Sequence, residues 1–181
     1  MAAGGGMMGN WAGVSAMLTR GLKSAKPVAL KRAAAYFEGQ VKKNLSSGGR
    51  LAGKPFVKLK AATLARRKRG KGSGKPTPLI DTGDMRNSVH PVVMDENTAF
   101  IGIRRGEIGR EGQDLLDIAQ VHEFGTVSKK SIPARPFLRP VVDKFAQAAG
   151  EVFAKALQKG FESGSSGGGG LAAGVGSLLS G

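Results

Sequence analysis

Residues 132–162 read IPARPFLRPVVDKFAQAAGEVFAKALQKGFE, a proline-rich segment that runs directly into a long amphipathic stretch. Apolar side chains recur at helical spacing from residue 138 onward, which predicts a helix over about 138–162. Pro140 suits the first turn of such a helix, where a backbone N–H has no partner within the helix. The apolar face is broad and must pack on other elements; it consists of Leu138, Val141, Val142, Phe145, Ala149, Val152, Phe153, Ala156, Leu157 and Phe161.

The segment before this helix has the features of a fixed connection. Three prolines between residues 133 and 140 restrict the backbone. Gly83 and Gly125 stand at element boundaries where a positive φ is expected. Arg135 is expected to pair with a carboxylate such as Glu123, and Phe137 to enter the core. These features predict a structural latch without chemistry of its own, which we define as Gly83, Glu123, Gly125, Arg135, Pro136 and Phe137.

The rest of the chain alternates helical and strand patterns. An apolar stripe predicts a helix over about 27–46 that begins at Pro27, and a short helix is expected over about 58–69. Residues 89–94 and 99–103 read as two strands joined by a turn. A further helix is expected from Leu115 to Gly125. The predicted fold class is α+β, with helices packed on a small antiparallel sheet and a long C-terminal helix.

Glycine, with 29 residues, is concentrated at the two ends of the chain. We therefore expect a Gly/Met-rich N-terminal extension over 1–26, an α+β domain over 27–162 with a basic loop at 48–78, and a Gly-rich tail over 163–181. Ordering a free chain end costs about 1–2 kcal/mol per residue, so an ordered Gly-rich end needs contacts that offset this cost. Both extended ends are expected to obtain such contacts by packing on neighbouring subunits. No run approaches the roughly 20 apolar residues of a membrane span.

The net charge of +15 belongs largely to one segment. Between Glu38 and Asp81 there are twelve basic residues and no acidic one. Such a segment favours a polyanion or an acidic protein surface. The candidate contact residues are Arg66, Arg67, Lys68, Arg69, Lys71 and Lys75. A DNA-binding module that uses residues 54–75 is therefore an alternative function, although no element for reading base sequence is recognisable.

Motifs of catalysis are incomplete. The chain has no cysteine and two histidines. His122 and Glu123 match the start of a zinc-protease helix, but Thr126 stands where the second histidine is required. The GKGSGK run at 70–75 lacks the spacing of a phosphate-binding loop. We expect no metal, no cofactor and no enzymatic activity; a hydrolase that uses His122 and Glu123 is the least favoured hypothesis.

Three segments in fixed order give the chain a resemblance to a known family. They are PLIDTGDMRNSV at 78–89, IAQVHEFGT at 118–126 and IPARPFLRPV at 132–141. With these the chain resembles the phage virion-morphogenesis or tail-completion proteins, including those of Mu-type phages and prophages. The stretch GKPFVKLKAATLARRK at 53–68 is similar to a further segment of that family. The resemblance covers about residues 50–160, and the two Gly-rich ends depart from it.

The resemblance implies a structural role. It leads us to expect a subunit of a bacteriophage neck or tail, which completes the tail or joins it to the head as part of a homo-oligomeric ring. The implied partners are other phage neck, tail-terminator or connector proteins, with non-specific contact to phage DNA as an option and no membrane. The implied location is the virion, after assembly in the host cytoplasm.

Overall fold

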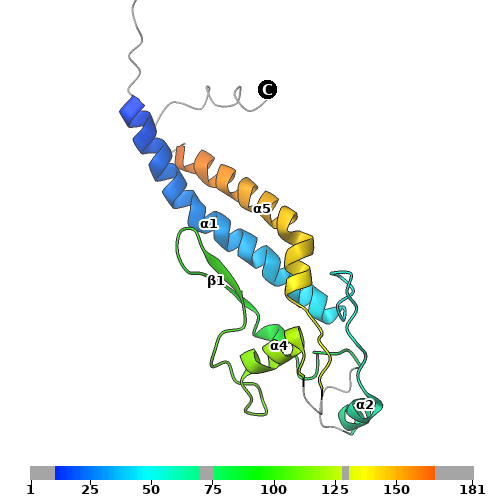
Figure 1. Ribbon diagram of the computed structural model, residues 1–181. Helices are drawn as coiled ribbons and strands as arrows, with labels where there is room; N and C mark the ends of the chain where they lie inside the picture. Colours follow the sequence, from blue (N-terminus) through cyan, green and yellow to red (C-terminus); the bar gives the residue numbers. More distant parts are fainter. Residues whose placement is uncertain (1–10, 70–75, 128–130, 166–181) are drawn as a thin grey trace, which may run out of the picture.

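Two long antiparallel helices lie side by side and form the largest part of the fold (Figure 1). They are α1 (Trp11–Ser46) and α5 (Arg139–Ser165). This computed structural model describes residues 11–69, 76–127 and 131–165, with the backbone alone at 11–17 and 164–165. The chain between the long helices forms a smaller lobe that contains α2 (Ala61–Lys68), α3 (Asp84–Asn87), β1 (His90–Val93), β2 (Ala99–Gly102) and α4 (Leu115–Phe124). The predicted α+β class is confirmed.

Small residues bring α1 and α5 close together. Ala25 and Ala29 of α1 are fully buried. A Cβ atom added to Gly160 would lie 2.9 Å from the Cβ of Ala25, and one added to Gly21 would lie 2.9 Å from the ring of Phe161. At such short separations the helix axes can approach only where side chains are absent or minimal. The two helices stay in contact far beyond the smaller lobe, so that the helix pair extends well away from it (Figure 1).

The expected helix start at Pro27 is wrong, because α1 already begins at Trp11 and contains Pro27 in its interior. The boundary expected between residues 26 and 27 therefore falls inside a helix. Proline lacks the N–H of the intrahelical bond, a defect that packing against a partner helix can offset. The apolar stripe predicted for this helix is buried at Ala34, Val41 and Leu45, whereas Val28, its first member, is 49% exposed.

The main core lies where the hairpin and α4 meet the lobe-facing half of the helix pair. Its central side chains are Val41 and Leu45 of α1, Val89 and Ile103 at the ends of the hairpin, Leu115 of α4, and Phe137 and Val141 near the start of α5. The two strands are antiparallel, with His90 opposite Gly102 and Val93 opposite Ala99. The predicted hairpin is confirmed to within a residue at each end.

The remaining predicted elements agree closely with the structure. α2 lies within the expected range 58–69, α4 ends at Phe124 with Gly125 as its C-cap, and α5 begins at Arg139 with Pro140 in its first turn.

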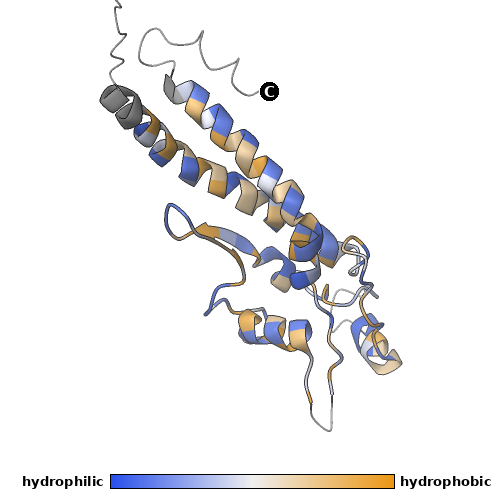
Figure 2. Ribbon diagram, turned by 45° about the horizontal axis from the view of Figure 1, so that its top comes forward, coloured by the Kyte–Doolittle hydropathy of each residue, from blue (hydrophilic) through white to orange (hydrophobic). Residues whose placement is uncertain are grey.

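Hydrophobic and hydrophilic residues are interspersed along both long helices (Figure 2). Within the described residues, none of the helices combines the length and the apolar character that crossing a bilayer requires. The expected packing of the terminal extensions on neighbours concerns residues 1–10 and 166–181, outside the described part.

Candidate functional site

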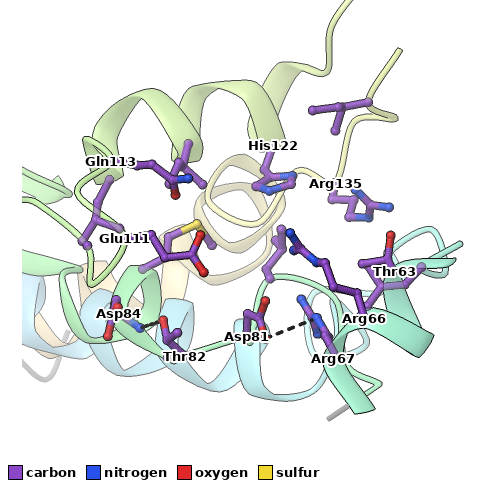
Figure 3. Close-up of a pocket in the computed structure, with 18 of the residues that line it drawn as sticks. Thr63, Arg66, Arg67, Asp81, Thr82, Asp84, Glu111, Gln113, His122 and Arg135 are labelled. Carbon is purple, nitrogen blue, oxygen red and sulfur yellow. Dashed lines mark hydrogen bonds and ion pairs between the residues drawn. The ribbon is translucent and has the colours of Figure 1, made fainter. Parts of the chain in front are cut away.

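A groove of about 700 Å³ is the candidate site (Figure 3). It lies between α2, the turn at residues 81–85, the loop at 109–113, one face of α4 and the segment 131–135. All three segments that carry the family resemblance contribute to its walls. Its size falls in the range of about 300–1,000 Å³ that is typical of ligand pockets.

The latch beside this groove is built on the carboxylate of Glu123. One of its oxygens, Oε2, accepts hydrogen bonds from the backbone N–H groups of Phe137 (2.8 Å) and Leu138 (3.1 Å). The other, Oε1, accepts from the N–H of Arg139 (3.0 Å). The first N–H groups of a helix have no partner within the helix, and a negative charge there also complements the helix dipole. Glu123 thus fixes the start of α5 to the end of α4.

The expected pairing of Arg135 with Glu123 is wrong. The guanidinium of Arg135 forms no ion pair with Glu123 and donates from Nε to the carbonyl oxygen of Val57 at 2.9 Å. Its backbone N–H donates to the carbonyl of His122 at 2.6 Å. The carboxylate of Glu123 instead accepts hydrogen bonds from three backbone N–H groups. Arg135 nevertheless holds the latch, since it ties the segment before α5 to the segment before α2.

The other latch residues adopt the predicted conformations and positions. Gly83 has φ +89° and Gly125 has φ +76°, which confirms the expected positive values. A Cβ atom on Gly125 would lie 3.0 Å from the backbone nitrogen of Ala134, a tight contact that adds to the cost of a side chain at this positive φ. Phe137 is buried in the core, as expected, and Pro136 before it is partly buried.

The basic residues of α2 do not form one surface. Arg66, Lys68 and Arg69 are exposed and remain available to a partner. Arg67 is 6% exposed, donates to the carbonyls of Thr77 and Ile80, and lies 3.4 Å from a carboxylate oxygen of Asp81. The expectation that Arg67 contacts a polyanion is therefore wrong, because its charge is used to fold the turn at 77–81 onto α2. The other two candidates, Lys71 and Lys75, lie outside the described residues.

His122 lines the groove and is partly buried. Its Nδ1 atom is buried and has no hydrogen-bond partner among the described residues. Burial, with a smaller contribution from the charge of Arg135, lowers the pKa of His122 from 6.5 to about 4. Glu123, the neighbour that a hydrolase would need, is held by backbone N–H groups. Across the described residues, no cluster of three or more His, Asp or Glu side chains is arranged to hold a metal ion.

The lowered pKa of His122 predicts a dependence of stability on pH. The unfolded chain binds a proton at His122 below about pH 6.5, whereas the folded chain binds it only near pH 4. Protonation therefore favours unfolding, and the unfolding free energy should fall as the pH decreases from 6.5 toward 4. The pKa of Asp95 is also lowered, chiefly by the backbone N–H of Asn97, so this carboxylate titrates below that window.

This dependence can be measured by urea denaturation at several pH values. His122→Gln removes the titrating group, so the slope between pH 6.5 and 4 should be smaller in this variant than in the unmodified chain. Equal slopes in the two proteins would show that other groups cause the dependence.

Two residues that support the site were not identified from the sequence. Asn44 is fully buried; its Nδ2 donates to the carbonyl of Phe137 and its Oδ1 accepts from the N–H of Ala52. Its position between Val41 and Leu45, on the apolar face of a helix, was the available signal. Gly49 has φ +87°. The loop that follows turns back toward Gly49, and the N–H of Lys54 donates a hydrogen bond to the carbonyl oxygen of Gly49.

A comparison with known proteins found no matching family model, no matching curated protein and no matching solved structure.

Proposed function

We propose that this chain is a structural subunit of a bacteriophage neck or tail, which completes the tail or joins it to the head as part of an oligomeric ring. The observation that carries the proposal is the convergence of the three family-like segments. Residues 78–89, 118–126 and 132–141 are far apart in sequence, yet all contribute to one groove and its adjoining latch. A resemblance whose residues form one connected unit is more informative than the same motifs scattered over a fold.

The roles of the latch residues support a scaffold rather than an enzyme. Glu123 caps a helix, Gly83 and Gly125 supply positive φ angles, and Phe137 fills the core. Each of these groups is used to position the backbone. The helix pair also leaves large apolar side chains partly exposed, namely Leu18, Leu22, Val28 and Val142. Apolar side chains on the outside of a subunit suit contacts between copies in a ring.

Contact with DNA is a second candidate role, supported by the exposed cations of α2. Arg66 and Lys68 of α2 and Arg69 directly after it are exposed, and further basic residues follow in the sequence. An isolated DNA-binding module should bind duplex DNA by itself, with affinity that falls steeply as salt increases. A neck or tail subunit should assemble with itself or with a phage partner whether or not DNA is present.

The test is electron microscopy of lysates from a phage or prophage that lacks this coding sequence. We expect full heads and tails that accumulate unjoined, or tails with abnormal ends, and restoration of normal particles by a complementing copy. A copy with His122→Ala should restore them equally, because the proposed role needs no chemistry at this side chain. Normal joined virions without the protein would overturn the proposal and favour the DNA-binding role.

A further inference from the structure

Arg135 carries a positive charge that no carboxylate of the described residues pairs with. Its side chain is 6% exposed, and its only side-chain hydrogen bond within those residues runs from Nε to the carbonyl of Val57. The two terminal nitrogens of the guanidinium have no acceptor in the described part of the chain, and they are not among its buried atoms, so solvent in the groove reaches them. Figure 3 shows Arg135 beside His122 in the wall of the groove. A guanidinium that is mostly removed from water and has accessible terminal nitrogens is well placed to pair with an incoming anion.

No acidic side chain of the same chain fills this role. All 13 aspartates and glutamates lie within the described residues, and none forms an ion pair with Arg135. Burial, and then the charge of Arg67, lowers the pKa of Arg135, and Arg66 lies on the same side of the groove (Figure 3). His122 is neutral at pH 7, because its pKa is about 4. An anion that pairs with Arg135 would therefore come from another molecule.

The groove itself indicates which kind of molecule supplies it. Asp84 and Glu111 lie toward the end of the groove opposite the arginines (Figure 3). Apolar side chains of Leu59, Met85, Ile118 and Ile132 lie among the polar ones. A DNA backbone, with a phosphate at every nucleotide, would also meet Glu111 and the Asp84–Arg110 pair (3.4 Å) at that end of the groove. A protein segment can combine apolar side chains with a single carboxylate.

We propose that this groove binds a segment of a partner protein through one carboxylate, which the terminal nitrogens of Arg135 hold in a bidentate pair while Arg66 adds charge at the mouth. Guanidinium and carboxylate match in geometry, and such charge-assisted pairs are among the stronger hydrogen bonds in proteins. The partner segment is expected to carry apolar residues next to its acidic one. This inference rests on the groove alone and holds whether or not the chain is a virion protein.

The first experiment compares two dye-labelled, capped peptides by fluorescence anisotropy with the full-length protein. One peptide alternates leucine and glutamate, and the other has glutamine in place of glutamate. A charge-assisted pair is stronger than a neutral hydrogen bond, so the glutamate peptide should bind at least about tenfold more tightly. Equal binding of the two peptides would overturn the proposal. A version with a free C-terminal carboxylate and no glutamate tests whether a chain end can supply the same group.

Substitutions then locate the binding. Arg135→Gln should lower the affinity for the glutamate peptide by about tenfold. Arg66→Gln, at an exposed position, should lower it by about two- to fivefold. The matched control is Lys68→Gln, since Lys68 is also an exposed cation of α2 but does not line the groove. It should leave the affinity unchanged.

Two outcomes in these variants would contradict the proposal. The first is that Lys68→Gln weakens binding as much as Arg66→Gln, which would indicate diffuse charge attraction. The second is that a short DNA duplex displaces the peptide in competition, which would assign the groove to nucleic acid. If Arg135→Gln does not fold, the comparison of Arg66→Gln with Lys68→Gln decides the question.

Discussion

Replacing Glu123 with alanine is expected to lower the unfolding free energy by about 3 kcal/mol. The substitution removes the acceptor for three backbone N–H groups at the start of α5. The N–H of Phe137 belongs to a residue that is 4% exposed, so water cannot replace the lost carboxylate there. Favourable interaction between the carboxylate and the dipole of the 27-residue helix is lost as well.

Chemical denaturation measures this effect, and two further variants define its cause. Glu123→Gln keeps one acceptor oxygen and should cost less than the alanine variant. Glu151→Ala removes an exposed glutamate within the same helix and should change the unfolding free energy by less than about 0.5 kcal/mol. If Glu123→Ala is as mild as Glu151→Ala, the capping role of Glu123 is wrong.

Gly49→Ala is expected to destabilise the fold by a similar amount, about 3 kcal/mol. Gly49 has φ +87°, which an L-amino acid adopts at a cost of about 1–2 kcal/mol. An added Cβ atom would also overlap the carbonyl oxygen of Lys54 and lie 2.7 Å from the ring of Phe56. The backbone of this loop would have to move, because neither contact involves the end of a flexible side chain.

Gly53 provides the matched control for this substitution. It lies in the same loop with φ +78°, and a Cβ atom added to it would meet no atom within 4 Å. Gly53→Ala should therefore show the conformational cost alone, about 1 kcal/mol. The difference between the two variants, measured by thermal or urea denaturation, isolates the steric contribution. Equal effects of the two substitutions would contradict the close approach at Gly49.

The sequence predicted the short elements well because their signals are local. The alternation over residues 99–103 and the glycine after Phe124 each depend on neighbours within a few positions. The positive φ angles at Gly83 and Gly125 followed from their places at element boundaries. These features arise from backbone sterics, which a single sequence reveals directly.

Partners that are distant in sequence were not predicted correctly. Pairing Arg135 with Glu123 assumed that opposite charges meet, whereas the start of α5 supplied three N–H donors to the carboxylate. Arg67 was assigned to the surface with its basic neighbours, because the sequence did not show that α2 packs on the turn at 77–81. The start of α1 was misplaced for a similar reason: packing on α5 sustains a helix through Pro27, against its local propensity.

The groove follows from the same tertiary contacts. Its arginines come from α2 and from the segment before α5, and its histidine comes from α4. No spacing in the sequence brings these three residues together. The sequence did contain the composition that makes an unmatched cation expected, with 28 basic residues against 13 acidic ones.

Quantitative mass spectrometry of purified particles tests the proposed role in the virion most directly. Particles of the phage or prophage that carries this coding sequence would be purified by density gradient, and peptides of this chain counted relative to a major capsid protein. A ring subunit should be present at a constant ratio of several copies per particle, and the ratio should survive a high-salt wash that removes loosely bound cationic proteins. Joined, infectious particles that contain none of this protein would contradict the account.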